Sequence, residues 1–75
     1  MNEKNITKIY TELGRRIVVT RKTRNISQEQ LASDSGIDRS HMGFIEQGRR
    51  RPTLSTIYKI THALGISLEE LFKGL

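Results

Sequence analysis

The stretch Ser27–Pro52, SQEQLASDSGIDRSHMGFIEQGRRRP, decides how this chain folds. Ser27 is a residue type that caps a helix N-terminus with its side-chain oxygen, and Gln30 at the third helical position predicts a capping box. The helix predicted over 28–35 ends at Gly36, because glycine most easily adopts the left-handed conformation found just beyond a helix C-terminus. A short helix followed by a tight turn is therefore expected.

A second helix is predicted directly after this turn. Asp38 caps it, and its carboxylate is also favoured by the helix dipole. The helix runs to about Gln47, with Met42 and Ile45 at its inward-facing positions. Residues of about 27–47 therefore form a helix-turn-helix unit, and three consecutive arginines follow it.

Three more helices are predicted outside this stretch. Apolar residues at one-face spacing predict a long helix over about 5–23, in which Gly14 indicates either a closely approaching neighbour or a tolerated surface position. Thr53 caps a fourth helix, and Ser67 with Glu70 makes a capping box for a short last one. The predicted fold class is all-α, with five helices. The stripe expected on the fourth helix consists of Leu54, Ile57, Tyr58, Thr61 and Leu64.

Length and composition limit how this chain can be stabilised. Its 75 residues make one small domain, 1–75, whose core is marginal by size. It has no cysteine, and His41 and His62 lack partners at metal-ligand spacing, so no disulfide, metal or other cofactor is expected. Dimerisation is the remaining aid to stability. With no signal peptide and no segment that can span a bilayer, a cytoplasmic location is expected.

The net charge of +5 lies in one part of the chain. Residues 1–51 hold eleven lysines and arginines against six acids, whereas residues 52–75 are neutral. A concentrated basic region attracts polyanions such as DNA, although a basic, solvated surface that only aids solubility is an alternative. Binding to a membrane surface is disfavoured, because no segment joins a wide apolar face to a lysine-rich one.

Eight motifs follow one another along residues 13–72: LGRRI (13–17), Arg21, SQEQLA (27–32), Gly36-Ile37, IEQG (45–48), RRRP (49–52), ALGIS (63–67) and ELF (70–72). In this order and spacing they resemble the XRE family of phage repressor and Cro-like helix-turn-helix proteins. The resemblance implies a lambda-repressor-like, five-helix DNA-binding domain in which the second and third helices read DNA. The DRS motif (38–40) and the short chain also resemble the controller proteins of restriction–modification systems. The chain departs from the commoner pattern at His41, Gly43 and Phe44.

The second helix of such a unit enters the DNA major groove with its N-terminus first. Arg39 and Ser40 would then read bases, since arginine can donate two hydrogen bonds to guanine. Phe44 shares their face and could pack on a thymine methyl group. Three alternatives remain open. Arg39 could pair with Asp38 or a phosphate, Ser40 could be merely solvated, and Phe44 could belong to the core or to a dimer contact.

A second set of residues is expected at the DNA backbone, with simple solvent exposure as the alternative. The resemblance implies this role for Gln28, Gln47 and Arg50, and the neighbouring charges add to it without reading sequence. The set consists of Gln28, His41, Gln47, Arg49, Arg50 and Arg51. The resemblance also implies that Arg21 and Glu46 form a structural ion pair between the first and third helices.

A dimer surface is expected in the C-terminal third of the chain, which is more apolar than one short helix can bury. The alternative is that most of these residues close the core of one chain. The set consists of Tyr58, Ile66, Leu68, Leu71, Phe72 and Leu75.

The expected function is that of a sequence-specific transcriptional regulator, and the finer resemblance implies the controller of a restriction–modification system. It would bind palindromic double-stranded operator DNA as a homodimer and would block or recruit RNA polymerase. An antitoxin or protein-interaction module of the same fold is the alternative. An enzyme is not expected, because no catalytic constellation is present.

Overall fold

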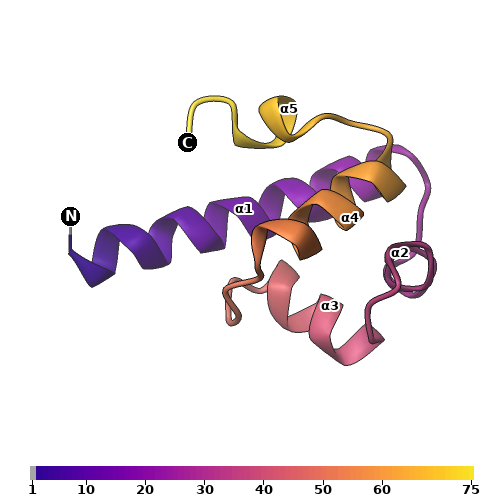
Figure 1. Ribbon diagram of the computed structural model, residues 1–75, viewed down its shortest axis with the longest axis horizontal. Helices are drawn as coiled ribbons and strands as arrows, with labels where there is room; N and C mark the ends of the chain where they lie inside the picture. Colours follow the sequence, from indigo (N-terminus) through magenta and orange to yellow (C-terminus); the bar gives the residue numbers. More distant parts are fainter. Residues whose placement is uncertain (1) are drawn as a thin grey trace.

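The computed structural model describes residues 2–75 and has five helices over them. They are α1 (Glu3–Thr23), α2 (Gln28–Ser35), α3 (Arg39–Glu46), α4 (Leu54–Leu64) and α5 (Leu68–Phe72). Residues 2–75 contain no strand, so the predicted all-α fold class is confirmed. Figure 1 shows α1 running the length of the molecule, with α3 and α5 on different sides of it. No helix in this part of the chain is long and apolar enough to cross a bilayer.

Side-chain caps start α2, α3, α4 and α5, as the sequence predicts, and Asn2 caps α1, which begins at Glu3 rather than at about residue 5. Ser67 Oγ accepts from the Glu70 amide at 3.0 Å while Glu70 Oε1 accepts from the Ser67 amide at 3.1 Å, a complete capping box. The box expected at Ser27 is only half formed. Ser27 Oγ accepts from the Gln30 amide, but the Gln30 side chain donates to Asp34 Oδ1 at 2.7 Å, one turn further along the helix.

The face that α4 buries agrees only in part with the predicted one, because Ile57, Thr61 and Leu64 are buried as predicted but the other two members are not. Leu54 and Tyr58 are 63% and 57% exposed, whereas Ile60, which lies outside the predicted stripe, is fully buried. The buried positions are Ile57, Ile60, Thr61 and Leu64. Both stripes have helical spacing, and the packing of α4 against α2 selects the second.

Gly14 lies where α1 meets α3. A Cβ atom on Gly14 would lie 2.4 Å from the Glu46 carbonyl oxygen and 2.6 Å from that of Ile45. Of the two interpretations of this glycine, the closely approaching neighbour is therefore right. The backbone of α3 is seated directly on α1, and this contact sets how far α3 stands from the core.

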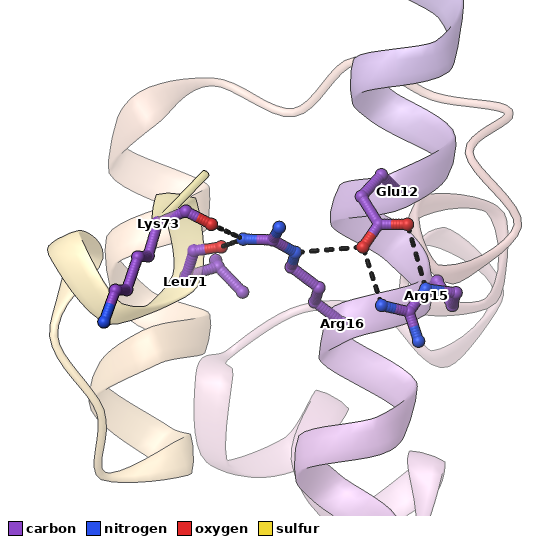
Figure 2. Close-up of polar contacts among 5 residues, drawn as sticks. All are labelled: Glu12, Arg15, Arg16, Leu71 and Lys73. Carbon is purple, nitrogen blue, oxygen red and sulfur yellow. Dashed lines mark hydrogen bonds and ion pairs between the residues drawn. The ribbon is translucent and has the colours of Figure 1, made fainter. Parts of the chain in front are cut away.

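Arg16 ties the C-terminal end of α5 to α1 (Figure 2). Its Nη1 donates to the carbonyl oxygens of Leu71 at 2.8 Å and Lys73 at 2.6 Å, which helix geometry leaves without intrahelical partners. Glu12 orients Arg16 by accepting from its Nε at 3.0 Å. Hydrogen bonds that Arg15 and, with a smaller effect, Arg16 donate to Glu12 lower the pKa of its carboxyl group from 4.5 to about 2.

This arrangement predicts that Glu12→Gln destabilises the protein in a pH-dependent way. Because the pKa of Glu12 is lower in the folded chain, its contribution to stability is full above about pH 4.5 and disappears as the pH falls towards 2. The variant should unfold more easily than the wild type at pH 7, by a small margin because about a third of the Glu12 side chain is exposed and water screens its ion pairs. Urea unfolding of both proteins at several pH values checks this. A difference that persists unchanged at the lowest pH would contradict it.

Candidate nucleic-acid interface

The leading end of α3 is held out at the surface. Asp38 Oδ2 accepts from the Ser40 amide at 3.1 Å and so starts the helix. Arg39, Ser40 and His41 in the first turn are exposed, whereas Met42 and Ile45 on the opposite side are buried in the core. The helix is therefore fixed by its inner face and presents its first turn to the exterior.

Residues from α2, α3 and the following loop gather around this end in two adjoining shallow hollows. One is lined by Gln28, Arg39, Ser40, Gly43, Phe44 and Gln47. The other is lined by Asp38, Ser40, His41, Phe44 and Arg50. We call the seven sequence-predicted DNA contacts among these residues the α3 face: Gln28, Arg39, Ser40, His41, Phe44, Gln47 and Arg50.

A chain of hydrogen bonds links Arg39 to the interior. Arg39 Nη1 donates to Gln28 Oε1 at 2.9 Å, and Gln28 Nε2 donates to Glu46 Oε1 at 2.9 Å. Gln28 therefore holds Arg39, and the pairing of Arg39 with Asp38 that the sequence left open is not the one adopted. The guanidinium of Arg39 is oriented before any ligand binds.

Arg21 and Glu46 form the ion pair at the inner end of this chain. Arg21 Nε and Nη2 donate to the two Glu46 carboxylate oxygens at 2.7 and 3.0 Å. The side chains are only 12% and 5% exposed, and the hydrogen bonds that Arg21 donates to Glu46 raise the pKa of Arg21. Arg21 Nη1 also donates to the Ile26 carbonyl at 3.3 Å. The pair joins α1, α3 and the connection before α2.

The three consecutive arginines do not act as one group. The Arg49 and Arg50 guanidinium carbons lie 5.2 and 5.3 Å from the centre of the Phe44 ring. Arg51 instead lies 5.5 Å from the Tyr10 ring and pairs with Glu3. Arg51, which is predicted from the sequence to lie at the DNA backbone, is therefore held at α1 and lines neither hollow.

The residues predicted for a dimer surface divide into two groups. Tyr58 and Leu75 are exposed, and the Tyr58 ring stacks on His62. Leu71 is only 2% exposed, because it faces the core, and it offers no surface to a second copy. This corrects the prediction for Leu71. The remaining members, Ile66, Leu68 and Phe72, are partly buried against the core.

Two side-chain pairings and two exposed apolar residues could not be predicted from the sequence. Nothing in the sequence indicated that Gln28 would hold Arg39, eleven residues away, or that Glu3 would pair with Arg51, 48 residues away. Val19 and Leu54 are also exposed, and no sequence pattern marks either of them as part of a partner surface. Their exposure depends on how the helices pack, which the sequence alone does not determine.

Comparison with known proteins identifies the family of this arrangement. The sequence model of HTH_3, described as helix-turn-helix, matches residues 20–71. The chain belongs to the HTH_3 family. The HTH_3 match takes in α2, α3 and α4 whole and therefore contains every residue of the α3 face.

Two controller proteins and one phage repressor are among the proteins similar to this HTH_3 member. Control protein C.MunI of Mycoplasma sp is 35% identical over 68 residues, 89% of this chain and 92% of that protein. The immunity repressor protein of Bacillus phage phi105 is 39% identical over 59 residues, 79% of this chain and 41% of the repressor. The crystal structure of the restriction-modification controller protein C.AhdI from Aeromonas hydrophila is 41% identical, with a TM-score of 0.82 over 84% of this chain and 96% of that one.

Proposed function

We propose that this protein, a DNA-binding helix-turn-helix transcriptional regulator, binds a palindromic operator as a homodimer with α3 in the major groove. The observation that carries the proposal is the α3 face, where residues of two helices and a loop meet around the exposed first turn of α3. Among the residues that line its two hollows, Arg39 and Arg50 outnumber the single acid, Asp38. Such a surface suits a polyanion with readable base edges.

Within this proposal the residues of the α3 face have different tasks. Arg39 and Ser40, at the leading end, read base edges, and Gln28 keeps the Arg39 guanidinium in place. Backbone amides at the N-terminus of α2 face a phosphate, which the helix dipole also favours. Of the other members, His41, Gln47 and Arg50 bind phosphates and fix the register on DNA.

A homodimer follows from the size of the site that one helix can read. One recognition helix covers only a few base pairs, and two copies on one face of DNA stand about 34 Å apart. We assign the contact between copies to the exposed apolar residues of the C-terminal third and their partly buried neighbours: Tyr58, Ile66, Leu68, Phe72 and Leu75.

Likeness to C.MunI and C.AhdI supports a role as the controller of a restriction–modification system. A dimer bound to an operator that overlaps a promoter would exclude RNA polymerase. A dimer bound just upstream of the promoter would recruit RNA polymerase. Binding to such DNA would place the protein in the cytoplasm, and the proposal assigns it no catalytic activity.

Selection of bound sequences from a random pool of DNA duplexes tests the proposal. The expected product is an inverted repeat whose half-sites are centred about one helical turn apart. A pool that stays random after several rounds would contradict sequence-specific binding, and a single unrepeated half-site would contradict the homodimer.

Arg39→Ala and Arg50→Ala should affect DNA binding in different ways. Arg39→Ala should remove about 1–3 kcal/mol of discrimination at one base pair of each half-site. Arg50→Ala should weaken binding to all sequences alike and make the salt dependence less steep, because it removes a phosphate contact. Titration of each variant against every single-base substitution of the selected site measures both effects. Equal behaviour of the two variants would show that Arg39 does not read a base.

A further inference from the structure

The loop after α3 is fixed at both ends. Gly48 has φ +74° and packs so tightly on α1 that a Cβ atom would lie 2.8 Å from Thr11 Cα. Pro52, at the other end, is buried. The Arg49 amide donates to the Phe44 carbonyl at 2.9 Å, so the chain turns back over the last turn of α3. The backbone path between Gly48 and Pro52 is therefore fixed, and the directions of the three arginine side chains between them depend on their contacts.

Aromatic rings determine the direction that these arginines take. Tyr10 and Glu3 draw Arg51 towards α1, whereas Phe44 has two guanidinium groups within 5.3 Å of its ring centre. Two positive groups gathered around one ring repel each other, and the negative face of the aromatic ring attracts both. Arg49 is held further by the Gln47 side-chain oxygen at 3.4 Å. Phe44 therefore gathers two positive charges at the end of the recognition helix.

We propose that Phe44 is a positioning residue that holds Arg49 and Arg50 in place for DNA phosphates. Phe44 lines both hollows of the α3 face, and Arg50 lines the second of them beside Ser40 and His41. Arginine side chains lose much rotamer freedom when they bind a phosphate, and an arginine already held against a ring has less to lose. Phe44 thus acts through the two arginines and does not read a thymine methyl group with its ring.

The inference rests on the proposed function for its DNA readout, and Phe44→Leu tests it. Leucine keeps an apolar side chain at this half-buried position and removes the π-system. Affinity should fall by about fivefold to thirtyfold for every duplex, including one without the operator. Phe44→Tyr, which keeps the aromatic ring, should bind DNA with the affinity of the wild type. Phe44→Met gives the same comparison in case leucine packs poorly, and thermal unfolding shows whether each variant folds.

Two further measurements separate positioning from other roles. In an Arg49→Ala/Arg50→Ala background at low salt, Phe44→Leu should cause no further loss, because the groups through which it acts are gone. In the free protein, NMR should show the Arg49 and Arg50 side-chain NH signals shifted upfield by the ring in the wild type and in Phe44→Tyr, but not in Phe44→Leu.

The outcomes that overturn the inference are distinct from those that overturn the function. A loss confined to duplexes with thymine at one position would show that Phe44 reads a base. An undiminished loss in the double-alanine background, or NMR shifts unchanged by Phe44→Leu, would show that it does not act through the arginines. Absence of salt-dependent DNA binding by the wild type would overturn the proposed function, whereas normal binding by Phe44→Leu would overturn this inference alone.

Discussion

Glu46→Ala is expected to lower the free energy of unfolding by about 3–5 kcal/mol, the effect seen when one partner of a buried ion pair is removed. Arg21 would keep its charge at a position where only 12% of its side chain is exposed, and Gln28 Nε2 would lose its acceptor. Small domains have roughly 5–15 kcal/mol of stability in total, so much of it would be lost. Urea unfolding followed by circular dichroism measures the change.

The Glu3–Arg51 ion pair provides the matched control. Its side chains are 72% and 46% exposed, and exposed pairs contribute little because water and salt screen them. Glu3→Ala should therefore leave the unfolding midpoint almost unchanged. If the two variants lost equal stability, burial of the Arg21–Glu46 pair would not be the cause.

Gly14→Ala should destabilise the fold by about 1–3 kcal/mol or more, the usual cost of overpacking. The new methyl group would lie within 2.6 Å of the carbonyl oxygens of Ile45 and Glu46, and backbone atoms cannot move aside as a flexible side chain can. To relieve the clash, α3 must shift away from α1, and the Arg21–Glu46 pair would lengthen with it. Thermal unfolding measures the loss.

Gly43→Ala is the control for this second prediction. Gly43 also lies inside a helix, but its added Cβ atom would meet only the Gln28 side chain, at an ordinary 3.7 Å. Because alanine favours a helix over glycine by about 1 kcal/mol, this variant should be as stable as the wild type or more so. If Gly14→Ala were equally stable, the close contact between α1 and α3 would be wrong.

The sequence predicts the helices of this protein well because caps are local. Ser27, Asp38, Thr53 and Ser67 start their helices through side chains that reach an amide two or three residues away, so nothing distant is needed. The spacing of apolar residues, in contrast, predicted the buried face of α4 only in part. Its apolar positions form two overlapping stripes, and only contact with α2 decides that Ile60 is buried and Leu54 is exposed.

For the candidate site, the sequence predicts positions better than partners. The cap at Asp38 places Arg39 and Ser40 at the leading end of α3, where the structure has them exposed. The partners depend on how the backbone folds back, which no local pattern encodes. The division of three identical arginines between Phe44 and Tyr10 is decided by the loop path from Gly48 to Pro52.

A titration of the selected operator at several salt concentrations tests the central claim most directly, with a scrambled duplex as the control. We predict a steep fall in affinity with salt, with a log–log slope of about −0.9 for each phosphate contacted. We also predict operator binding at least about a thousandfold tighter than binding to the scrambled duplex. A slope near zero, or equal affinity for the two duplexes, would contradict the claim that α3 reads DNA.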